Sequence, residues 1–259
     1  MNSTARHRRR YGLLVLLPAF ILTSSLAGQN SPPRIVHVFV ALADNLHQGI
    51  APVPARLGNG DDPAHNLYWG AAGGVKTFFV RSGAWALLSC SPKPKPEVLE
   101  RCMFKHRQTN TYMVADAYRG SEIREALIEF FDAAAGVSSE TVAVLGSVEM
   151  LTIRGGSNLV TYVGHDGLME FQLPLIPKKK NDNHRDAVIL ACASKQYFAA
   201  TLRTGGAYPL LWTTNLMAPL DGWIAGETAG QIRDRAASAY DKYQKCGYKA
   251  ARRLFATGW

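Results

Sequence analysis

Two side chains that can do covalent chemistry follow two apolar runs in this sequence. Residues 159–163 are apolar and lead to His165, and residues 187–191 are apolar and lead to Cys192. Each run has the near-continuous apolar character of a strand buried in a parallel sheet. If the two strands are neighbours, His165 and Cys192 meet at the carboxyl edge of the sheet, where open α/β sheets place their active sites. An imidazole beside a thiol is suited to nucleophilic catalysis by cysteine.

The residues around the pair favour the same chemistry. A helix is predicted over 194–202, directly after Cys192, and the unpaired N–H groups of a helix N-terminus favour a thiolate. Backbone N–H groups near the pair could also stabilise an oxyanion, and the candidates are Gly164, Gly167 and Ala193. The segment between His165 and Cys192 is long enough for a parallel crossover connection.

These motifs resemble those of a known family. An apolar strand ending in His-Gly, followed by an apolar strand ending in Ala-Cys or Gly-Cys, is the signature of the caspase–gingipain–legumain group of cysteine peptidases. Residues 162–165 (Tyr-Val-Gly-His) are similar to the gingipain version, and residues 189–192 (Ile-Leu-Ala-Cys) match the cysteine block. The resemblance covers roughly residues 140–215, and it implies a caspase-like α/β sandwich with His165 as catalytic histidine and Cys192 as nucleophile. Asp166 departs from the pattern, because the group normally has glycine directly after the histidine.

Each residue of the pair also has an ordinary structural interpretation. A cysteine that ends an apolar strand is usually a small buried hydrophobe, and a single histidine usually packs or caps. The catalytic interpretation is favoured by the combination of the two at consecutive strand ends, in the order of the family.

A long polar, glycine-rich segment, residues 44–74, follows the first predicted strand at 34–43, and such insertions are often functional. Four residues are predicted to line a substrate cleft: Asp44, Asn45, Asp116 and Asp166. Oxygen ligands for calcium are the alternative use of this segment, through Asp44, Asn45, His47, Asn59, Asp61, Asp62 and Asn66. Their spacing matches no EF-hand loop, so ordinary turn chemistry is favoured. No other cofactor or metal site is expected.

Residues 1–27 read as an export signal. Four arginines (Arg6, Arg8, Arg9 and Arg10) precede an apolar stretch at 13–22, and 25–27 (Ser-Leu-Ala) fits the small-x-small rule before a cleavage point. An uncleaved anchor is the alternative, although the apolar stretch is short for a membrane span. The sequence therefore predicts a periplasmic or secreted protein with no stable membrane span after cleavage.

The charge of the chain excludes one class of partner. Removing the four arginines of the signal leaves 25 basic residues against 20 acidic ones, so the net charge falls from +9 to +5. The run Lys178-Lys179-Lys180 is expected to be a solvated loop. Nucleic-acid binding needs a longer basic stripe, so no nucleic-acid partner is expected.

The four cysteines are too few for a disulfide scaffold in a chain of 259 residues. Cys90 and Cys102 could close a loop, whereas Cys192 and Cys246 are then free or paired together. The sequence leaves this connectivity open.

The remaining pattern alternates strands with helices and predicts an α/β fold, a three-layer sandwich with a mostly parallel central sheet. Further strands are expected at 76–81, 109–118 and 209–214, with one or two within 141–152; helices are expected from Ser121 to Gly136 and over 227–245; and residues 91–97 are expected to form a proline-spaced linker. Residues 28–259 are expected to form a single domain.

Two functions follow as hypotheses. The first is an exported cysteine endopeptidase that acts on a peptide or protein substrate with a His165/Cys192 dyad. The second is a catalytically inactive envelope protein of the same fold that binds a ligand or calcium through residues 44–74. The absence of G-x-S-x-G, G-x-G-x-x-G, P-loop, H-E-x-x-H and C-x-x-C motifs argues against several other enzyme classes.

Overall fold

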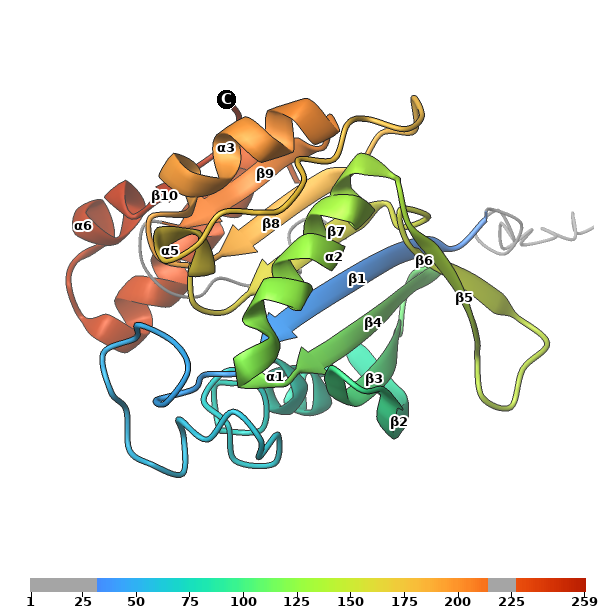
Figure 1. Ribbon diagram of the computed structural model, residues 1–259, viewed down its shortest axis with the longest axis horizontal. Helices are drawn as coiled ribbons and strands as arrows, with labels where there is room; N and C mark the ends of the chain where they lie inside the picture. The colour runs from blue at the N-terminus through green and yellow to red at the C-terminus, as the bar shows by residue number, and fades with distance from the viewer. Residues whose placement is uncertain (1–31, 214–226) are drawn as a thin grey trace, which may run out of the picture. The chain divides into compact units, whose positions relative to one another are not determined.

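The computed structural model describes residues 32–213 and 227–259, and the export signal predicted for residues 1–27 lies outside them. One large sheet dominates the fold (Figure 1), with eight strands in the order β10-β9-β8-β7-β1-β4-β3-β2. Its strands are β1 (Arg34–Ala41), β2 (Trp85–Lys95), β3 (Val98–His106), β4 (Thr111–Tyr118), β7 (Leu159–Val163), β8 (Asp186–Leu190), β9 (Tyr208–Thr213) and β10 (Phe255–Ala256). A separate two-stranded hairpin is formed by β5 (Ser139–Ala143) and β6 (Met150–Arg154).

The sheet is mixed. Strands β4, β1, β7, β8 and β9 pair in parallel with their neighbours. The pairs β2–β3, β3–β4 and β9–β10 at the two sides are antiparallel. The edge at which the parallel strands end is called the carboxyl edge below, and the opposite edge, where they begin, the amino edge.

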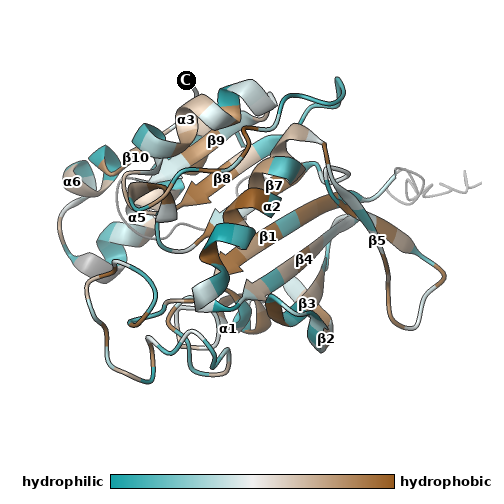
Figure 2. Ribbon diagram, viewed as in Figure 1, coloured by the Kyte–Doolittle hydropathy of each residue, from teal (hydrophilic) through white to brown (hydrophobic). Residues whose placement is uncertain are grey.

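Helices cover both faces of the sheet, as the alternation of strands and helices predicts. One face packs against α2 (Ile123–Ala135) and α3 (Ser194–Gly205), through aromatic residues such as Phe130 and Phe198. The other face packs against α1 (Val75–Arg81), α5 (Ala229–Gln244) and α6 (Tyr248–Arg253). Figure 2 shows the hydrophobic colour concentrated on the central strands, which are enclosed by these two layers. The prediction of an α/β fold is confirmed, and the arrangement is consistent with a three-layer sandwich.

Two predicted elements differ in the structure. Residues 76–81, predicted as a strand, lie in helix α1, because Val75 and Phe79 are one helical turn apart and both are buried. Residues 91–97, predicted as a linker, form the outer part of β2 and its turn into β3. An edge strand tolerates Pro92 and Pro94 because its outer side needs no N–H donor.

The other elements follow the sequence closely. The hairpin β5–β6 accounts for the strands expected within 141–152. Helix α2 starts two residues later than predicted, since Ser121 lies in a 3-10 turn, η1 (Gly120–Glu122), and does not cap the helix. Gly136 ends the helix with a positive φ of 73°, as its residue type predicts.

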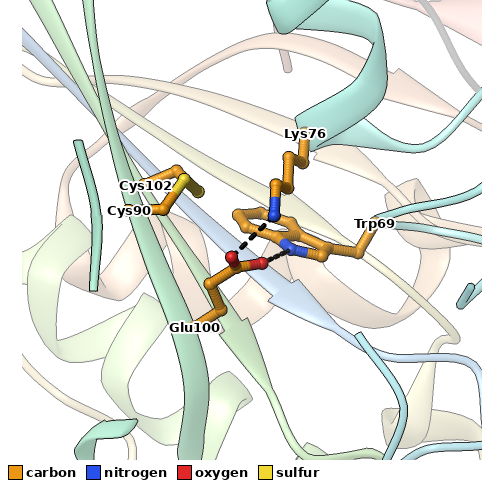
Figure 3. The surroundings of a disulfide bond; sticks show 5 residues. All are labelled: Trp69, Lys76, Cys90, Glu100 and Cys102. Atoms are coloured by element: carbon orange, nitrogen blue, oxygen red, sulfur yellow. Dashed lines mark hydrogen bonds and ion pairs between the residues drawn. A yellow bond between two sulfur atoms is a disulfide. The ribbon is translucent and has the colours of Figure 1, made fainter. Parts of the chain in front are cut away.

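A disulfide joins Cys90 on β2 to Cys102 on β3, directly opposite in the ladder. This is one of the pairings that the sequence left open, and Cys192 and Cys246 are free thiols. Beside it, the Glu100 carboxylate accepts hydrogen bonds of 2.6 Å from both Trp69 and Lys76 (Figure 3). The β2–β3 pair is thereby tied to the segment that follows β1.

Candidate active site at the carboxyl edge

Adjacent parallel strands bring His165 and Cys192 to the same level of the sheet. Strands β7 and β8 pair with Val163 opposite Leu190, and the Gly164 N–H extends the ladder to the Leu190 carbonyl at 3.2 Å. His165 and Cys192 each lie two residues beyond this last matched pair. The prediction that the two strands are neighbours in one parallel part of the sheet is confirmed.

The imidazole of His165 is held by an acidic partner. Its Nε2 lies 2.5 Å from Oε1 of Glu170, and the same oxygen accepts a hydrogen bond of 2.7 Å from the N–H of Gly49. The backbone is fixed as well, because the Tyr162 hydroxyl donates to the His165 carbonyl at 2.7 Å. Within the described part of the chain, Nδ1 of His165 takes part in none of the hydrogen bonds. That nitrogen is the one available for proton transfer.

Cys192 lies in a tight turn between β8 and α3. Ala193, the residue after it, has a left-handed φ of 49°, and Ser194 begins the helix with its hydroxyl accepting from the N–H of Thr213 at 3.0 Å. The Ser194 hydroxyl in turn donates to the Thr213 carbonyl at 2.7 Å, which clamps the turn to β9. A left-handed non-glycine residue is uncommon and holds Cys192 in a defined position.

The pKa of Cys192 is shifted in the opposite direction to that predicted from its place before a helix. Burial raises the pKa of the Cys192 thiol, and the nearby Asp166 carboxylate raises it further. A backbone hydrogen bond to the sulfur lowers the pKa, but it is outweighed by these two effects. No hydrogen bond joins Cys192 to His165, although the structure describes both residues. The thiol form is therefore the resting form, and a base is needed to activate it.

Asp166 is the most unusual group at this edge. Its side chain is fully buried, and one oxygen accepts from the N–H of Leu168 at 3.1 Å at the start of η2 (Gly167–Met169). Its other oxygen, Oδ2, is buried and receives no hydrogen bond from the residues that the structure describes. Burial, together with the neighbouring Glu170, raises the pKa of Asp166 to about 7. Asp166, which stands where the resembling motifs have glycine, is thus a buried carboxyl group that raises the pKa of Cys192.

The backbone groups predicted to stabilise an oxyanion divide into two sets. The N–H of Gly164 donates to Leu190 and that of Gly167 donates to the His165 carbonyl at 3.1 Å, so both are already engaged. The two glycines serve close packing, because a Cβ at Gly164 would lie 3.0 Å from Ala41 and one at Gly167 would lie 2.7 Å from Phe171. The N–H of Ala193 donates none of the hydrogen bonds found in the described residues. Ala193 is the remaining candidate of the three.

The segment after β1 lies at the carboxyl edge, but its polar groups serve the segment itself. The Asp44 carboxylate accepts from the N–H groups of Leu46 and His47 and lies 2.8 Å from the His47 imidazole. Both amide atoms of Asn45 bond to the backbone of Val53. Asp44 and Asn45, predicted to line a cleft, act here as turn-forming residues.

The oxygens considered for calcium are also occupied by hydrogen bonds and ion pairs. Asp62 pairs with His65, Asp61 with Arg119, and Asn66 accepts from two backbone N–H groups. Across residues 32–213 and 227–259, Cys90, Glu100 and Cys102 are the one group spaced for a metal ion, and the two sulfurs are bonded to each other. These contacts support turn chemistry in residues 44–74.

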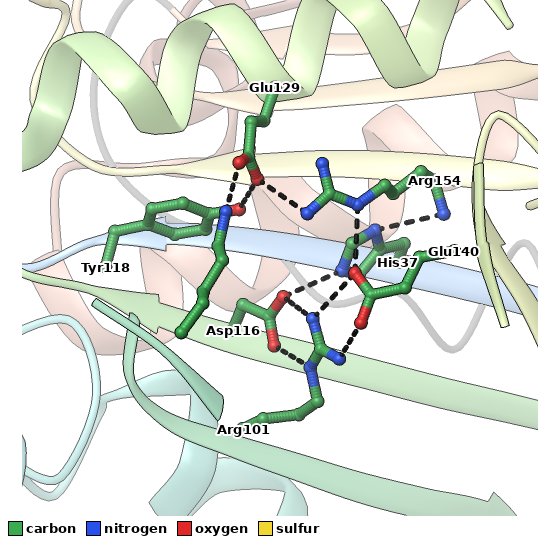
Figure 4. Close-up of polar contacts among 8 residues, drawn as sticks. His37, Arg101, Asp116, Tyr118, Glu129, Glu140 and Arg154 are labelled. Atoms are coloured by element: carbon green, nitrogen blue, oxygen red, sulfur yellow. Dashed lines mark hydrogen bonds and ion pairs between the residues drawn. The ribbon is translucent and has the colours of Figure 1, made fainter. Parts of the chain in front are cut away.

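Asp116 lies away from the carboxyl edge, in a buried ionic cluster on the α2 side of β4 (Figure 4). Its carboxylate accepts two hydrogen bonds from Arg101, at 2.6 and 2.8 Å, and lies 3.2 Å from Nε2 of His37. The sequence prediction that Asp116 lines the cleft is therefore wrong, because the residue lies within the strand instead of at its end.

The same cluster extends along the sheet to the hairpin. Glu140 pairs with Arg101 and Arg154, and Glu129 pairs with Arg154, Lys95 and the Tyr118 hydroxyl. The positive charges thus match the negative ones, and His37 is neutral, accepting at Nδ1 from the N–H of Arg154 at 3.3 Å. Burial lowers the pKa of His37, whereas Arg101 and His37 hold the pKa of Asp116 well below its usual range against the effect of burial. The cluster is complete within itself and ties the hairpin to the sheet.

Two residues of the carboxyl edge were not predicted from the sequence. Glu170 reaches His165 because the η2 turn folds the chain back on itself, a geometry that no motif signals. Tyr68 is buried near Cys192, and burial together with that thiol raises the pKa of Tyr68 to about 12. The one sequence signal for the Glu170–His165 contact was the presence of an acidic residue five positions after the histidine.

Comparison with models of known protein families, with curated proteins and with solved structures found no match. No helix in the described ranges combines the length and apolar character needed to cross a membrane.

Proposed function

We propose that this chain is an exported cysteine peptidase of divergent caspase-like type, with Cys192 as nucleophile and His165 as acid–base. The observation that carries the proposal is the placement of both residues two positions beyond the same rung of the β7–β8 ladder. The resemblance of both strand ends to the caspase–gingipain–legumain motifs supports the same assignment.

The proposed reaction follows from the surroundings of the two side chains. Because the pKa of Cys192 is raised, its proton passes to Nδ1 of His165 as the sulfur attacks the scissile carbonyl. The N–H of Ala193 donates to the oxyanion that forms. The protonated His165 then gives its proton to the leaving amine, and water hydrolyses the thioester. Glu170, bound to Nε2, fixes the orientation of the ring throughout.

The same evidence supports the finer description of the fold. The run β4-β1-β7-β8-β9 is parallel throughout, and helices cover both of its faces. We infer a caspase-like sandwich in which this parallel run is the central part and β2 and β3 form an antiparallel side.

Export is supported by the disulfide. Disulfides persist in oxidising compartments, and Cys90–Cys102 would not be maintained in a reducing cytosol. Together with the arginine-rich and apolar character of residues 1–27, this supports a periplasmic or secreted location.

The test is cleavage of a diverse library of fluorogenic peptides by the purified protein. We expect turnover that is lost in Cys192→Ser and retained in Cys246→Ser, since Cys246 is the other free thiol and lies on an exposed turn. Equal turnover in the wild type and Cys192→Ser would refute the assignment.

The alternative is an inactive protein of the same fold, and one observation favours it. Asp166 opposes ionisation of Cys192, which an efficient thiol enzyme would avoid. Under this alternative, no peptide in the library is cleaved, and Cys192 reacts with alkylating reagents no faster than an ordinary thiol.

A further inference from the structure

The amino edge of the sheet, opposite the candidate active site, carries an exposed apolar feature. The hairpin β5–β6 extends past this edge (Figure 1), and three large apolar side chains near its turn are exposed: Leu145 by 75%, Val148 by 101% and Met150 by 56%. Part of this loop has the hydrophobic colour in Figure 2. Exposed apolar residues gathered on one projecting loop mark a contact surface more often than isolated ones do.

The base of the hairpin is held by apolar packing and by ion pairs. Val144, Leu151 and Ile153 pack against residues at the start of the central strands, including Ile35 and Tyr112. The ion pairs of Glu140 and Arg154 anchor the base of the hairpin in the buried cluster. A turn that is held in this way presents its apolar side chains in a fixed direction.

Basic side chains surround the hairpin on the same edge. The β3–β4 turn places Lys105 over the Tyr112 ring, 4.4 Å from its centroid, and exposes Arg107. The run Lys178-Lys179-Lys180 is also exposed, and the backbone of Lys180 is fixed by a bond of 2.8 Å to Ala135 at the end of α2. Arg185, in the same loop, donates at 2.7 Å to Gly155 at the exit of the hairpin. The basic loop and the apolar hairpin therefore belong to one connected edge.

We propose that the amino edge docks on an anionic lipid surface, with Leu145 and Val148 entering the headgroup region and the lysine run contacting lipid charges. The turn favours lipid over an acidic protein partner, because its exposed large side chains are uncharged and exposed lysines lie on the same edge. Its one acidic residue, Glu149, is half-buried and accepts a hydrogen bond from the Tyr112 hydroxyl. This orientation leaves the carboxyl edge, with His165 and Cys192, facing away from the membrane. The proposal is independent of whether the chain is a peptidase.

The test is the depth of a label at the hairpin turn in the full-length chain. An environment-sensitive fluorophore is attached to Val148→Cys in a Cys192→Ser/Cys246→Ser background. The matched control carries the same label at Leu46→Cys, which is 87% exposed on the segment after β1. Vesicles contain either phosphatidylcholine alone or a mixture with phosphatidylglycerol, and a quencher is placed in the acyl chains.

We expect a blue shift and quenching of the label at position 148 on anionic vesicles, and neither at position 46. Lys178→Gln and Lys180→Gln should each weaken this partitioning about fivefold. Lys179→Gln should weaken it less, because Lys179 is paired with Asp182 at 2.7 Å. The proposal is overturned if the label at 148 remains in water on anionic vesicles. It is equally overturned if the shift occurs without lipid and grows with protein concentration, which would assign the hairpin to contact with a second copy.

Discussion

The sheet holds two pairs of histidine and aspartate whose surroundings are opposite. In the buried cluster, His37 bonds at both ring nitrogens and Asp116 is bound by Arg101 and His37. At the carboxyl edge, the residues described in the structure bind His165 through one nitrogen and leave one oxygen of Asp166 without a hydrogen bond. Accordingly, the pKa of Asp116 is held low, whereas that of Asp166 is raised to about 7.

The comparison shows what separates a structural polar group from a candidate functional one. Both aspartates are fully buried, so burial alone does not distinguish them. The difference is whether residues 32–213 and 227–259 supply a hydrogen-bond partner for each polar atom. A complete cluster stabilises the fold, whereas an incomplete one leaves atoms free to act on another molecule.

The largest contrast is expected between the two histidines. His165→Gln should lower turnover by roughly 10²- to 10⁴-fold with little change in stability, because it removes the acid–base group. His37→Gln should leave turnover intact and lower the free energy of unfolding by about 1–3 kcal/mol, since it disturbs a buried hydrogen-bonded pair. Peptide cleavage measures the turnover of both variants, and urea unfolding measures their stability. The comparison fails if His37→Gln abolishes turnover in folded protein.

His37 also predicts an acid dependence. Burial lowers its pKa in the folded protein, so the unfolded chain binds the extra proton as pH falls below roughly 6.5. Stability should therefore decline below that pH, and this part of the decline should vanish in His37→Gln.

Asp116→Asn should give the largest loss of stability among the aspartate variants. Removing one partner from a buried ion pair costs about 3–5 kcal/mol, and Arg101 retains Glu140, so the lower value is expected. In the wild type, the contribution of Asp116 is present above the unfolded pKa of roughly 3.9 and is lost as pH falls below it. Unfolding at pH 7 and pH 2 tests both statements, and a neutral effect at pH 7 would contradict them.

Asp166→Asn should act in the opposite direction. Because the folded pKa is raised, the contribution of Asp166 is present below roughly pH 4 and is lost as pH rises towards 7. At pH 8 the variant should be more stable than the wild type, by an amount on the order of 3 kcal/mol. The pKa of Cys192 should fall too, which is measured as a shift of its alkylation profile to lower pH. Unchanged stability and an unchanged profile would show that the two groups are not coupled.

Glu170→Gln should have the smallest effect. The substitution keeps an acceptor for the N–H of Gly49 but loses the charge that holds His165, a difference of roughly 1.5 kcal/mol. We expect about a tenfold fall in kcat with KM unchanged. A change confined to KM would indicate that Glu170 contacts substrate instead.

The sequence predicted the parts of this site that depend on strand order. Apolar runs identify β7 and β8, and their ends fix where His165 and Cys192 lie. Helix α2 followed from its apolar face and from Gly136 at its end, and α3 was expected from its place directly after Cys192.

The rest depends on contacts between distant segments, which one sequence does not encode in a local pattern. Asp116 was assigned to the cleft because Arg101, its partner across β3 and β4, cannot be identified without the pairing of those strands. The raised pKa of Cys192 was missed because it depends on burial and on Asp166 across the β7–β8 ends. The strand β2 was missed because its prolines indicate a linker unless an edge position is known.

The central claim is that His165 and Cys192 act as a pair, and labelling of Cys192 tests it most directly. In a Cys246→Ser background, a peptide carrying a thiol-reactive group is incubated with the folded protein, and modified Cys192 is quantified by mass spectrometry. We predict labelling at least roughly 100-fold faster in this background than in the same background with His165→Gln. Equal rates in the two proteins would contradict the account.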